Sequence, residues 1–470
     1  MKELRALLQT SFQELETTMF QILCAQFRSV LQEVLAELDE RLYQARDRGR
    51  WRVKGFRERD VEGLLGPVRL RRRQYWDEAE GRYVFLLDEA LGLTKRARVS
   101  PGLVEAAVWQ GLNGPSYRQG QAALERLYGR PVLSHETIRQ LVLQTGTWVT
   151  RETQRRQEAV QGTRRVPMLF LEADGLYVHL QRDQAQGLEK QVVVSHEGWE
   201  RRSGQDYALK ERHYYVASEG EDFWESVSRQ IYSRYDLAGA VVVLNGDRAP
   251  WIREGVEYFR DAAVVLYQWD RFHLAKELRQ LLVHQPERLQ AALEAFRQSD
   301  ATRLLAELAQ AEGAERDAKR RARIRGLKQA VLADPEAVRD YRVRLRERGY
   351  STQGLRGLGA AESTMDRFAN RMKKRGQSWG RHGLHPLVAA LAKHLEGQLQ
   401  PYVQHLALVK ELSGLVRWVE ERTAGLTRRI VQDVYVPKQG SLPATRVGRQ
   451  RASGLNHFLN QIRRPSLEWV

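Results

Sequence analysis

Five apolar runs between residues 167 and 269 place the strongest constraint on what this chain can fold into. Their composition predicts strands at 167–180, 189–198, 206–218, 240–246 and 262–269, with helices near 221–235, 251–259 and 271–284. The first three strands follow one another without a helix, which indicates an antiparallel meander. The last two are separated by helices, which is typical of parallel crossovers. We therefore expect a mixed five-stranded α/β sheet.

Two aspartates stand out within these runs. Asp174 lies in "VPMLFLEADGLYVHL", where an ionised carboxylate is costly unless it is paired or binds a cation. The alternative is a turn, because Asp-Gly is also a hairpin signal. Asp247 follows the apolar run 240–244, at the carboxyl end of a strand, where sites of open α/β sheets lie. Its alternative is an Asx turn or a cap for the next helix.

A third acid, Glu362, opens a helix after the Gly-rich "STQGLRGLGAAES". The alternative is an acid that merely favours the helix N-terminus, and Glu277, Glu336 and Glu347 are other candidates for the third position. Three converging carboxylates repel one another, and bound cations relieve that repulsion. Two Mg²⁺ ions held by oxygen ligands would suit phosphodiester displacement. Period two puts Glu172 on the strand face of Asp174, as an auxiliary ligand or a supporting acid.

The composition favours a nucleic-acid partner. The 470 residues carry a formal net charge of +17, which points to a polyanion, with an acidic membrane surface as the second candidate. The single cysteine, Cys24, excludes an internal disulfide and a Cys-rich zinc finger. We find no phosphate-binding GxxxxGK[ST] loop and no run of about 18 apolar residues. The N-terminus is too charged for a signal peptide, so we expect a cytoplasmic protein without a membrane partner.

The remaining segments suggest DNA-binding and helical regions. Periodic apolar residues predict a helix over 2–47, which either dimerises or packs on its own domain, and "GPVRLRRRQYW" with "GRYVFLLDEALGL" predicts a small basic hairpin. Residues 101–150 read as a helix-turn-helix or an ordinary helical hairpin, with Gly129 and Ser134 as caps. The candidate DNA contacts are Arg71, Arg72, Arg73, His135, Thr137, Arg139 and Gln140, with Lys373, Lys374 and Arg375 expected on the helix of Glu362.

We divide the chain into seven segments. The expected order is an N-terminal helix, a small β-rich basic segment, a helix-turn-helix-like region, the first part of an α/β core, an all-helical insertion, the second part of the core, and a basic tail. Their bounds are 1–50, 51–100, 101–164, 165–284, 285–350, 351–434 and 435–470.

Several segments together resemble a known family. "LEADGLYVHLQ", "EGWE", "RHYYVASEG", "VVLNGDRAPWI" and "QWDRFHLAKELR" resemble insertion-sequence transposases of the ISLre type, which belong to the DDE superfamily with an RNase H-like fold. Asp270-x-x-His273 is similar to the [C/D]xxH element that related transposases place before an all-helical insertion, and 285–350 fits that insertion.

The resemblance implies a function. Asp174, Asp247 and Glu362 would be the catalytic and metal-binding acids for two Mg²⁺ or Mn²⁺ ions, with Asp270 and His273 shaping the site. The activity would be nicking of DNA at the ends of the element, followed by transfer of the freed 3′-hydroxyl to target DNA. The partners would be double-stranded DNA of the terminal repeats and target, and a second copy in a homodimer or larger assembly. A non-catalytic DNA-binding regulator and a metal-dependent structure-specific nuclease are the alternatives.

Overall fold

A computed structural model describes residues 11–93, 97–159, 161–204, 206–217 and 220–406, and its first helix is α2 (Phe12–Ala45). Helix α2 starts where the sequence provides a capping box. The Ser11 hydroxyl accepts a hydrogen bond from the Glu14 backbone amide at 3.1 Å, and the Glu14 carboxylate accepts one from the Ser11 amide at 2.9 Å. The predicted helix over 2–47 is therefore confirmed within the described residues, with an end two residues early.

The basic segment is a three-stranded antiparallel sheet in the order β1-β2-β3. Its strands are β1 (Trp51–Gly63), β2 (Gly66–Asp77) and β3 (Arg82–Val84). The predicted hairpin exists, since Tyr75 pairs with Val84, but it is only three pairs long and the short helix α3 (Leu86–Ala90) follows. The main partner of β2 is β1, which the hairpin prediction missed because charged residues interrupt the apolar alternation of β1. Helix α2 packs on this sheet through Leu31 and Leu35.

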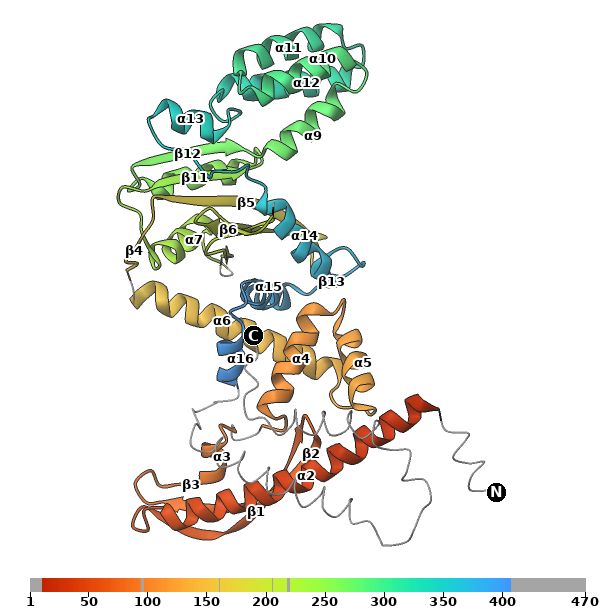
Figure 1. Cartoon of the computed structure of the whole chain (residues 1–470), viewed down its shortest axis with the longest axis vertical. Helices are drawn as coiled ribbons and strands as arrows, with labels where there is room; N and C mark the ends of the chain where they lie inside the picture. The colour runs from red at the N-terminus through yellow and green to blue at the C-terminus, as the bar shows by residue number, and fades with distance from the viewer. Residues whose placement is uncertain (1–10, 94–96, 160, 205, 218–219, 407–470) are drawn as a thin grey trace, which may run out of the picture. The chain divides into compact units, whose positions relative to one another are not determined.

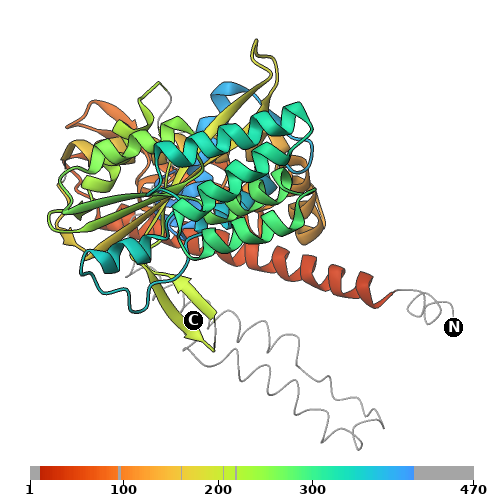
Figure 2. The same cartoon turned by 90° about the horizontal axis from the view of Figure 1, so that it is seen from above.

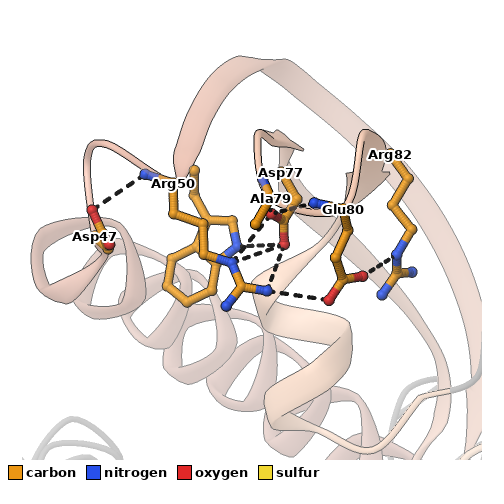
Figure 3. Close-up of polar contacts among 7 residues, drawn as sticks. Asp47, Arg50, Asp77, Ala79, Glu80 and Arg82 are labelled. Atoms are coloured by element: carbon orange, nitrogen blue, oxygen red, sulfur yellow. Dashed lines mark hydrogen bonds and ion pairs between the residues drawn. The ribbon is translucent and has the colours of Figure 1, made fainter.

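One buried carboxylate links two parts of this small sheet (Figure 3). Asp77, 2% exposed at the end of β2, accepts hydrogen bonds from the Arg50 guanidinium, the Trp51 indole and the backbone amides of Ala79 and Glu80. The Arg50 contact is the largest cause that lowers the pKa of Asp77 to about 2. The carboxylate thus joins the start of β1 to the turn between β2 and β3.

We expect Asp77→Asn to lower the melting temperature by about 2–4 °C at pH 7, because the amide cannot accept this whole set of donors. The folded-state pKa lies below the ordinary value of 3.8. The carboxylate therefore stabilises the fold above about pH 4, and this contribution is lost as the pH falls towards 2. Urea unfolding followed by circular dichroism from pH 7 to pH 3 should show the variant and the wild type converging. Glu80→Gln, at an exposed neighbour, is the control; an equal effect of both variants would contradict the assignment.

Three helices follow the small sheet: α4 (Pro101–Asn113), α5 (Tyr117–Tyr128) and α6 (His135–Ala159). Both predicted caps are confirmed: Gly129 is left-handed with φ of 66°, and the Ser134 hydroxyl accepts from the Thr137 amide at 3.1 Å. Helix α6 crosses α15 (Arg381–Leu395) at Gly146, where an added Cβ would collide with the backbone of Pro386. Glycine is therefore required for this close approach.

The central sheet has the strand order β12-β11-β5-β6-β9, with the short β13 pairing with one end of β5. The strands are β5 (Met168–Leu180), β6 (Gly187–His196), β9 (His213–Tyr215), β11 (Val241–Gly246), β12 (Val264–Trp269) and β13 (Ser378–Trp379). Strands β5, β6 and β9 are antiparallel neighbours, whereas β5, β11 and β12 are parallel. The predicted mixed sheet, with a meander followed by parallel crossovers, is confirmed.

Two predicted elements of this region are corrected. The expected strand 206–218 is divided between β8 (Asp206–Leu209), which pairs with β7 (Trp199–Ser203) in a separate hairpin, and β9. This hairpin (yellow-green) extends away from the sheet in Figure 2. The expected helix 251–259 is α8 (Pro250–Glu254) followed by the 3₁₀ helix η1 (Gly255–Phe259). A further pair of two-residue strands, β4 (Arg164–Arg165) and β10 (Tyr235–Asp236), is parallel.

Helices cover both faces of the central sheet. Leu171 and Ala173 of β5 pack with α7 (Phe223–Tyr232) and α9 (Arg271–Leu281) in one core. On the opposite face, Leu176 and Val178 pack with α14 (Ala360–Met372) and α15. The even-numbered residues of β5 therefore face α14, and these include Glu172 and Asp174.

The segment after α9 is helical, as predicted. Its helices are α10 (Pro286–Arg297), α11 (Ala301–Ala314), α12 (Ala318–Ala333) and α13 (Tyr341–Glu347). Helices α14, α15 and α16 (Gln400–Leu406) follow, and Figure 1 shows α14 beside β5. No helix among the described residues combines the length and apolar content needed to cross a membrane. The predicted basic tail 435–470 lies outside the described residues.

Candidate functional site

Parallel pairing of β5 with β11 brings two of the predicted acids together. The register sets Glu172 opposite Asn245 and Ala173 opposite Gly246. Extending it by one residue puts Asp247, the first residue after β11, beside Asp174. The two aspartates therefore lie at neighbouring strand positions, at the carboxyl end of β11, where α/β sheets carry their sites.

Asp174 is half-buried, and its Oδ1 accepts a hydrogen bond from the Gly175 amide at 2.7 Å. Burial raises the pKa of Asp174 to about 6, and the negative charges of Asp247 and Glu362 act in the same direction. His273 opposes this rise. All three predicted acids, and the predicted histidine, are therefore close enough to influence one another electrostatically.

The Asp247 side chain stabilises the local backbone turn and also lines a cavity. Its Oδ1 accepts from the Ala249 amide at 2.8 Å, which is the Asx turn that the sequence left open as an alternative. A cavity of about 300 Å³ lies beside it, and Asp270 and His273 contribute to the lining. The Tyr267 hydroxyl donates to the Asp247 carbonyl at 2.8 Å and fixes the backbone there.

Glu362 lies in the first turn of α14 and faces His273. The Glu362 Oε2 and the His273 Nε2 are 3.5 Å apart, and the Glu362 side chain is 46% exposed. On the other side of the ring, the His273 Nδ1 is 3.5 Å from Oδ1 of Asp270. Asp270 caps α9, because the same Oδ1 accepts from the His273 amide at 2.9 Å. The predicted Asp-x-x-His element is thus joined to Glu362.

The alternative third acids lie in ion pairs. Glu277 pairs with Arg248 at 2.6 Å, while Glu336 and Glu347 pair with Arg339 in the helical insertion. Glu362 is the glutamate of this group whose charge acts on Asp174. The placement therefore favours Glu362 over the other three.

Glu172 lies next to the acids but is already fully engaged. It is 1% exposed, and its Oε2 accepts hydrogen bonds from the amides of Gly359 at 2.8 Å and Ala361 at 3.4 Å. Its Oε1 is 3.2 Å from the His196 Nε2, and the Asn245 amide donates to Oε2 at 3.4 Å. Of the two predicted roles, the structure favours the supporting acid: Glu172 supplies the cap that α14 lacks locally.

Two polar residues that the sequence reading missed complete this arrangement. The Asn245 amide also donates to Asp270 Oδ2 at 3.1 Å, and the Gln268 amide donates to Asn245 Oδ1 at 3.2 Å. Gln268 Oε1 then accepts from the Tyr341 amide at 2.6 Å. Polar side chains inside the apolar runs "VVVLNG" and "VVLYQW" are the signal that would have identified them.

The ligand chemistry of the three acids fits divalent metal ions, because all the donors are hard carboxylate oxygens. Burial is the largest cause of the raised pKa of Asp174, and the negative charges of Asp247 and Glu362 add to it. The acids do not close around a common point, however. Among the described residues, no group of three His, Cys, Asp or Glu side chains is arranged to hold a metal ion.

The predicted DNA contacts of the small sheet are mostly engaged within the fold. Arg72 is buried in an ion pair with Asp88, and Arg73 pairs with Asp39 and Glu40. These partners lie on α3 and α2, so Arg72 and Arg73 hold helices to β2. Arg71 is exposed, stacked over the Phe56 ring at 4.2 Å, and its DNA contact stays a prediction.

The helical candidates lie near the start of α6. The His135 amide donates to Gln121 of α5, Thr137 lies next to the capping Ser134, and Arg139 and Gln140 both contact Glu136. Whether they meet DNA stays a prediction. Three other candidates are exposed but lie in the turn after α14, which ends at Met372, so their expected place on that helix is wrong: Lys373, Lys374 and Arg375.

The described structure is a mixed α/β protein with a cluster of acids at the strand ends of its central sheet. The chain belongs to a family described as "Uncharacterised protein family (UPF0236)", whose model matches residues 7–406. It is 24% identical to a UPF0236 protein of Streptococcus gallolyticus over 419 residues, which cover 86% of this chain and 88% of the relative. A UPF0236 protein of Caldanaerobacter subterraneus subsp. tengcongensis is 25% identical over 364 residues, 76% of this chain and 72% of the relative.

Among solved structures, the chain is similar to a "Drosophila P element transposase strand transfer complex" at 12% identity. The match covers 66% of this chain and 81% of that chain with a TM-score of 0.21. A similarity at this level is too weak to establish a common fold.

We expect Glu172→Ala to loosen the first turn of α14, because the amides of Gly359 and Ala361 lose their acceptor. Hydrogen exchange at these two amides should accelerate by about tenfold or more, while the exchange of β11 and β12 amides changes less. Glu287→Ala, an exposed acid in the first turn of α10, is the control and should leave α14 unchanged. Unaltered protection of α14 in the Glu172 variant would show that the helix start does not depend on this carboxylate.

Proposed function

We propose that this protein is an insertion-sequence transposase of the DDE type, with an RNase H-like catalytic core. The observation that carries the proposal is the proximity of Asp174, Asp247 and Glu362, since the charges of Asp247 and Glu362 both act on Asp174. Asp174 lies on β5, and Asp247 directly follows β11. The main path of the sheet, numbered along the chain as β5, β6, β9, β11 and β12, has the spatial order 3-2-1-4-5, and the short sixth strand β13 pairs with β5. The glutamate follows an all-helical insertion.

In this proposal the three acids hold two Mg²⁺ or Mn²⁺ ions, which supply charge stabilisation for phosphodiester cleavage when bound. Glu172 acts through Glu362, because it fixes the start of the helix that carries it. His273 lies between Glu362 and Asp270, and in this proposal its ring contacts the scissile phosphate. In this proposal water hydrolyses a phosphodiester bond at the element end and frees a 3′-hydroxyl. That hydroxyl attacks a phosphodiester of the target DNA and displaces a target 3′-hydroxyl, without a covalent protein intermediate.

The names of the relatives support a mobile element. The name of one UPF0236 protein of Caldanaerobacter subterraneus combines eleven designations, and the name of another combines four. A protein encoded at many places in one genome is what an element that copies or moves itself produces. The net charge of +17 suits a protein that handles DNA.

The proposal includes double-stranded DNA of element ends and target as substrate, and a homodimer or larger assembly that pairs two ends. Exposed apolar side chains on α2 support a contact surface for a second copy: Phe12, Leu15, Met19, Phe20 and Ile22. Arg71, the start of α6 and the turn after α14 remain candidate DNA contacts.

A non-catalytic DNA-binding regulator is the second candidate. The observation in its favour is that the acids of the described chain do not form a closed metal site. A structure-specific nuclease on the same fold would cut DNA but would not join 3′-ends.

The test compares the wild type with Asp174→Asn, Asp247→Asn and Glu362→Gln on DNA that carries the element ends. We expect Mg²⁺-dependent nicking and strand transfer by the wild type, and a loss of at least a hundredfold in each variant, since each removes a charged ligand. Binding to the same DNA, measured in EDTA, should persist in all three variants. Glu287→Gln, at an exposed acid of α10, is the control and should remain active.

The outcomes separate the candidates. Binding without any cleavage by the wild type would favour the regulator, and cleavage without joining would favour the nuclease. Full activity of Glu362→Gln would show that Glu362 is not a catalytic residue.

A further inference from the structure

A second, larger cavity lies at the N-terminal part of α14, and its lining does not include Asp174, Asp247 or Glu362. It has a volume of about 700 Å³ and opens between the β7–β8 hairpin and the N-terminal part of α14. We call it the arginine cleft, after four of its lining residues: Arg202, Arg212, Arg356 and Arg367. Tyr207, Trp199 and Ser363 also line it.

Four arginines and three acids line the arginine cleft, and its arginines are not paired with those acids. None of its four arginines forms an ion pair with a carboxylate of the described residues, although arginines elsewhere in the chain commonly do. Two of its three acids are committed elsewhere, Glu172 to α14 and Glu396 to Lys393 and the Tyr214 amide. Asp206 is the remaining acid in the lining. Arg212 donates to the Leu395 carbonyl at 3.2 Å and lies over the Tyr214 ring. Guanidinium groups without a carboxylate partner recognise phosphate groups.

The cleft also presents aromatic rings. The Tyr207 residue is 38% exposed, and the Arg356 guanidinium lies over its ring at 3.8 Å from the centroid. Trp199 packs against Phe170 and His196, which hold it at the cleft wall. A positively charged groove with aromatic rings that accept stacked bases is the arrangement that binds single-stranded nucleic acid.

The size of the cleft favours a short ligand. A volume of about 700 Å³ is that of a small-molecule pocket, which is too small to enclose a double helix. A few unpaired nucleotides fit, with their bases against Tyr207 and their phosphates against the arginines. We propose that the arginine cleft binds a short single-stranded DNA segment.

Helix α14 connects this segment to the acids. Glu362 faces His273 and Asp174, whereas the next residue, Ser363, and Arg367 one turn later line the cleft. A strand in the cleft would therefore continue past the start of α14 to the acid cluster. That it is the strand being cut rests on the proposed function, but the binding itself requires no catalysis.

The test measures fluorescence anisotropy of a labelled 12-nucleotide oligothymidylate and of a duplex of the same length, both in EDTA. We expect Arg356→Gln/Arg367→Gln to weaken oligothymidylate binding by about tenfold or more. The slope of log affinity against log salt should fall by about 1.4, since single strands lose about 0.7 per phosphate contact. Duplex binding should change little.

Two controls make the test specific. Arg316→Gln/Arg323→Gln removes the same charge from exposed arginines of the helical insertion and should leave oligothymidylate binding near the wild-type value. Tyr207→Ala should weaken binding by about tenfold, whereas Tyr207→Phe keeps the ring and should restore it. Circular dichroism of each variant verifies its fold.

The proposal is overturned if both double variants weaken binding equally, if duplex binding depends equally on Arg356 and Arg367, or if the wild type does not bind the oligothymidylate. Because the assay contains no metal and no cleavage step, it succeeds or fails independently of the transposase activity. Binding of the oligothymidylate without any DNA cleavage would support the proposed strand-binding site and argue against the proposed transposase activity.

Discussion

The buried carboxylate of Glu172 is the interaction on which the rest of the acid cluster depends. A charge that is 1% exposed is stable only when donors surround it, and here they come from β6, β11 and the start of α14. The amides of Gly359 and Ala361 would otherwise be open groups at a helix N-terminus, whose positive end favours a negative charge. The same contact therefore satisfies a buried acid, caps a helix and places Glu362 beside two aspartates of the sheet.

A polar chain extends this arrangement to the far end of the helical insertion. Asn245 joins Glu172 to Asp270, and Gln268 joins Asn245 to the Tyr341 amide at the start of α13. The helix that leads into the insertion, α9, is thus tied to the strand ends through Asp270, and α13 near the end of the insertion is tied through Tyr341. Buried polar networks of this kind specify one arrangement because a displaced member leaves its partner without a hydrogen bond. The insertion can vary internally while the acids keep their positions.

The sequence predicted those parts of the structure that local pattern determines. Strands β5, β11 and β12 are buried apolar runs, and Asp174 and Asp247 stand out in them because charge is rare there. The caps Gly129 and Ser134 follow from conformation within a few residues. The role of Glu172 did not follow, because its partner amide at Gly359 lies 187 residues away. The prediction for Arg72 failed for the same reason. A run of arginines on a strand indicates an exposed face, and only the tertiary structure shows that Arg72 is paired with Asp88.

Helix α14 carries Glu362 in the acid cluster and Arg367 in the arginine cleft, and this separates binding from chemistry. The acid cluster repels a phosphate until cations occupy it, whereas the arginines of the cleft attract phosphates in the absence of any metal. Under the proposed function, a DNA strand would first be held on the cleft side and then meet the acids once the ions are bound. Salt would weaken the first step through counterion release, and metal concentration would govern the second. One helix, fixed by one buried carboxylate, would then set the distance between the held phosphates and the cleaved one.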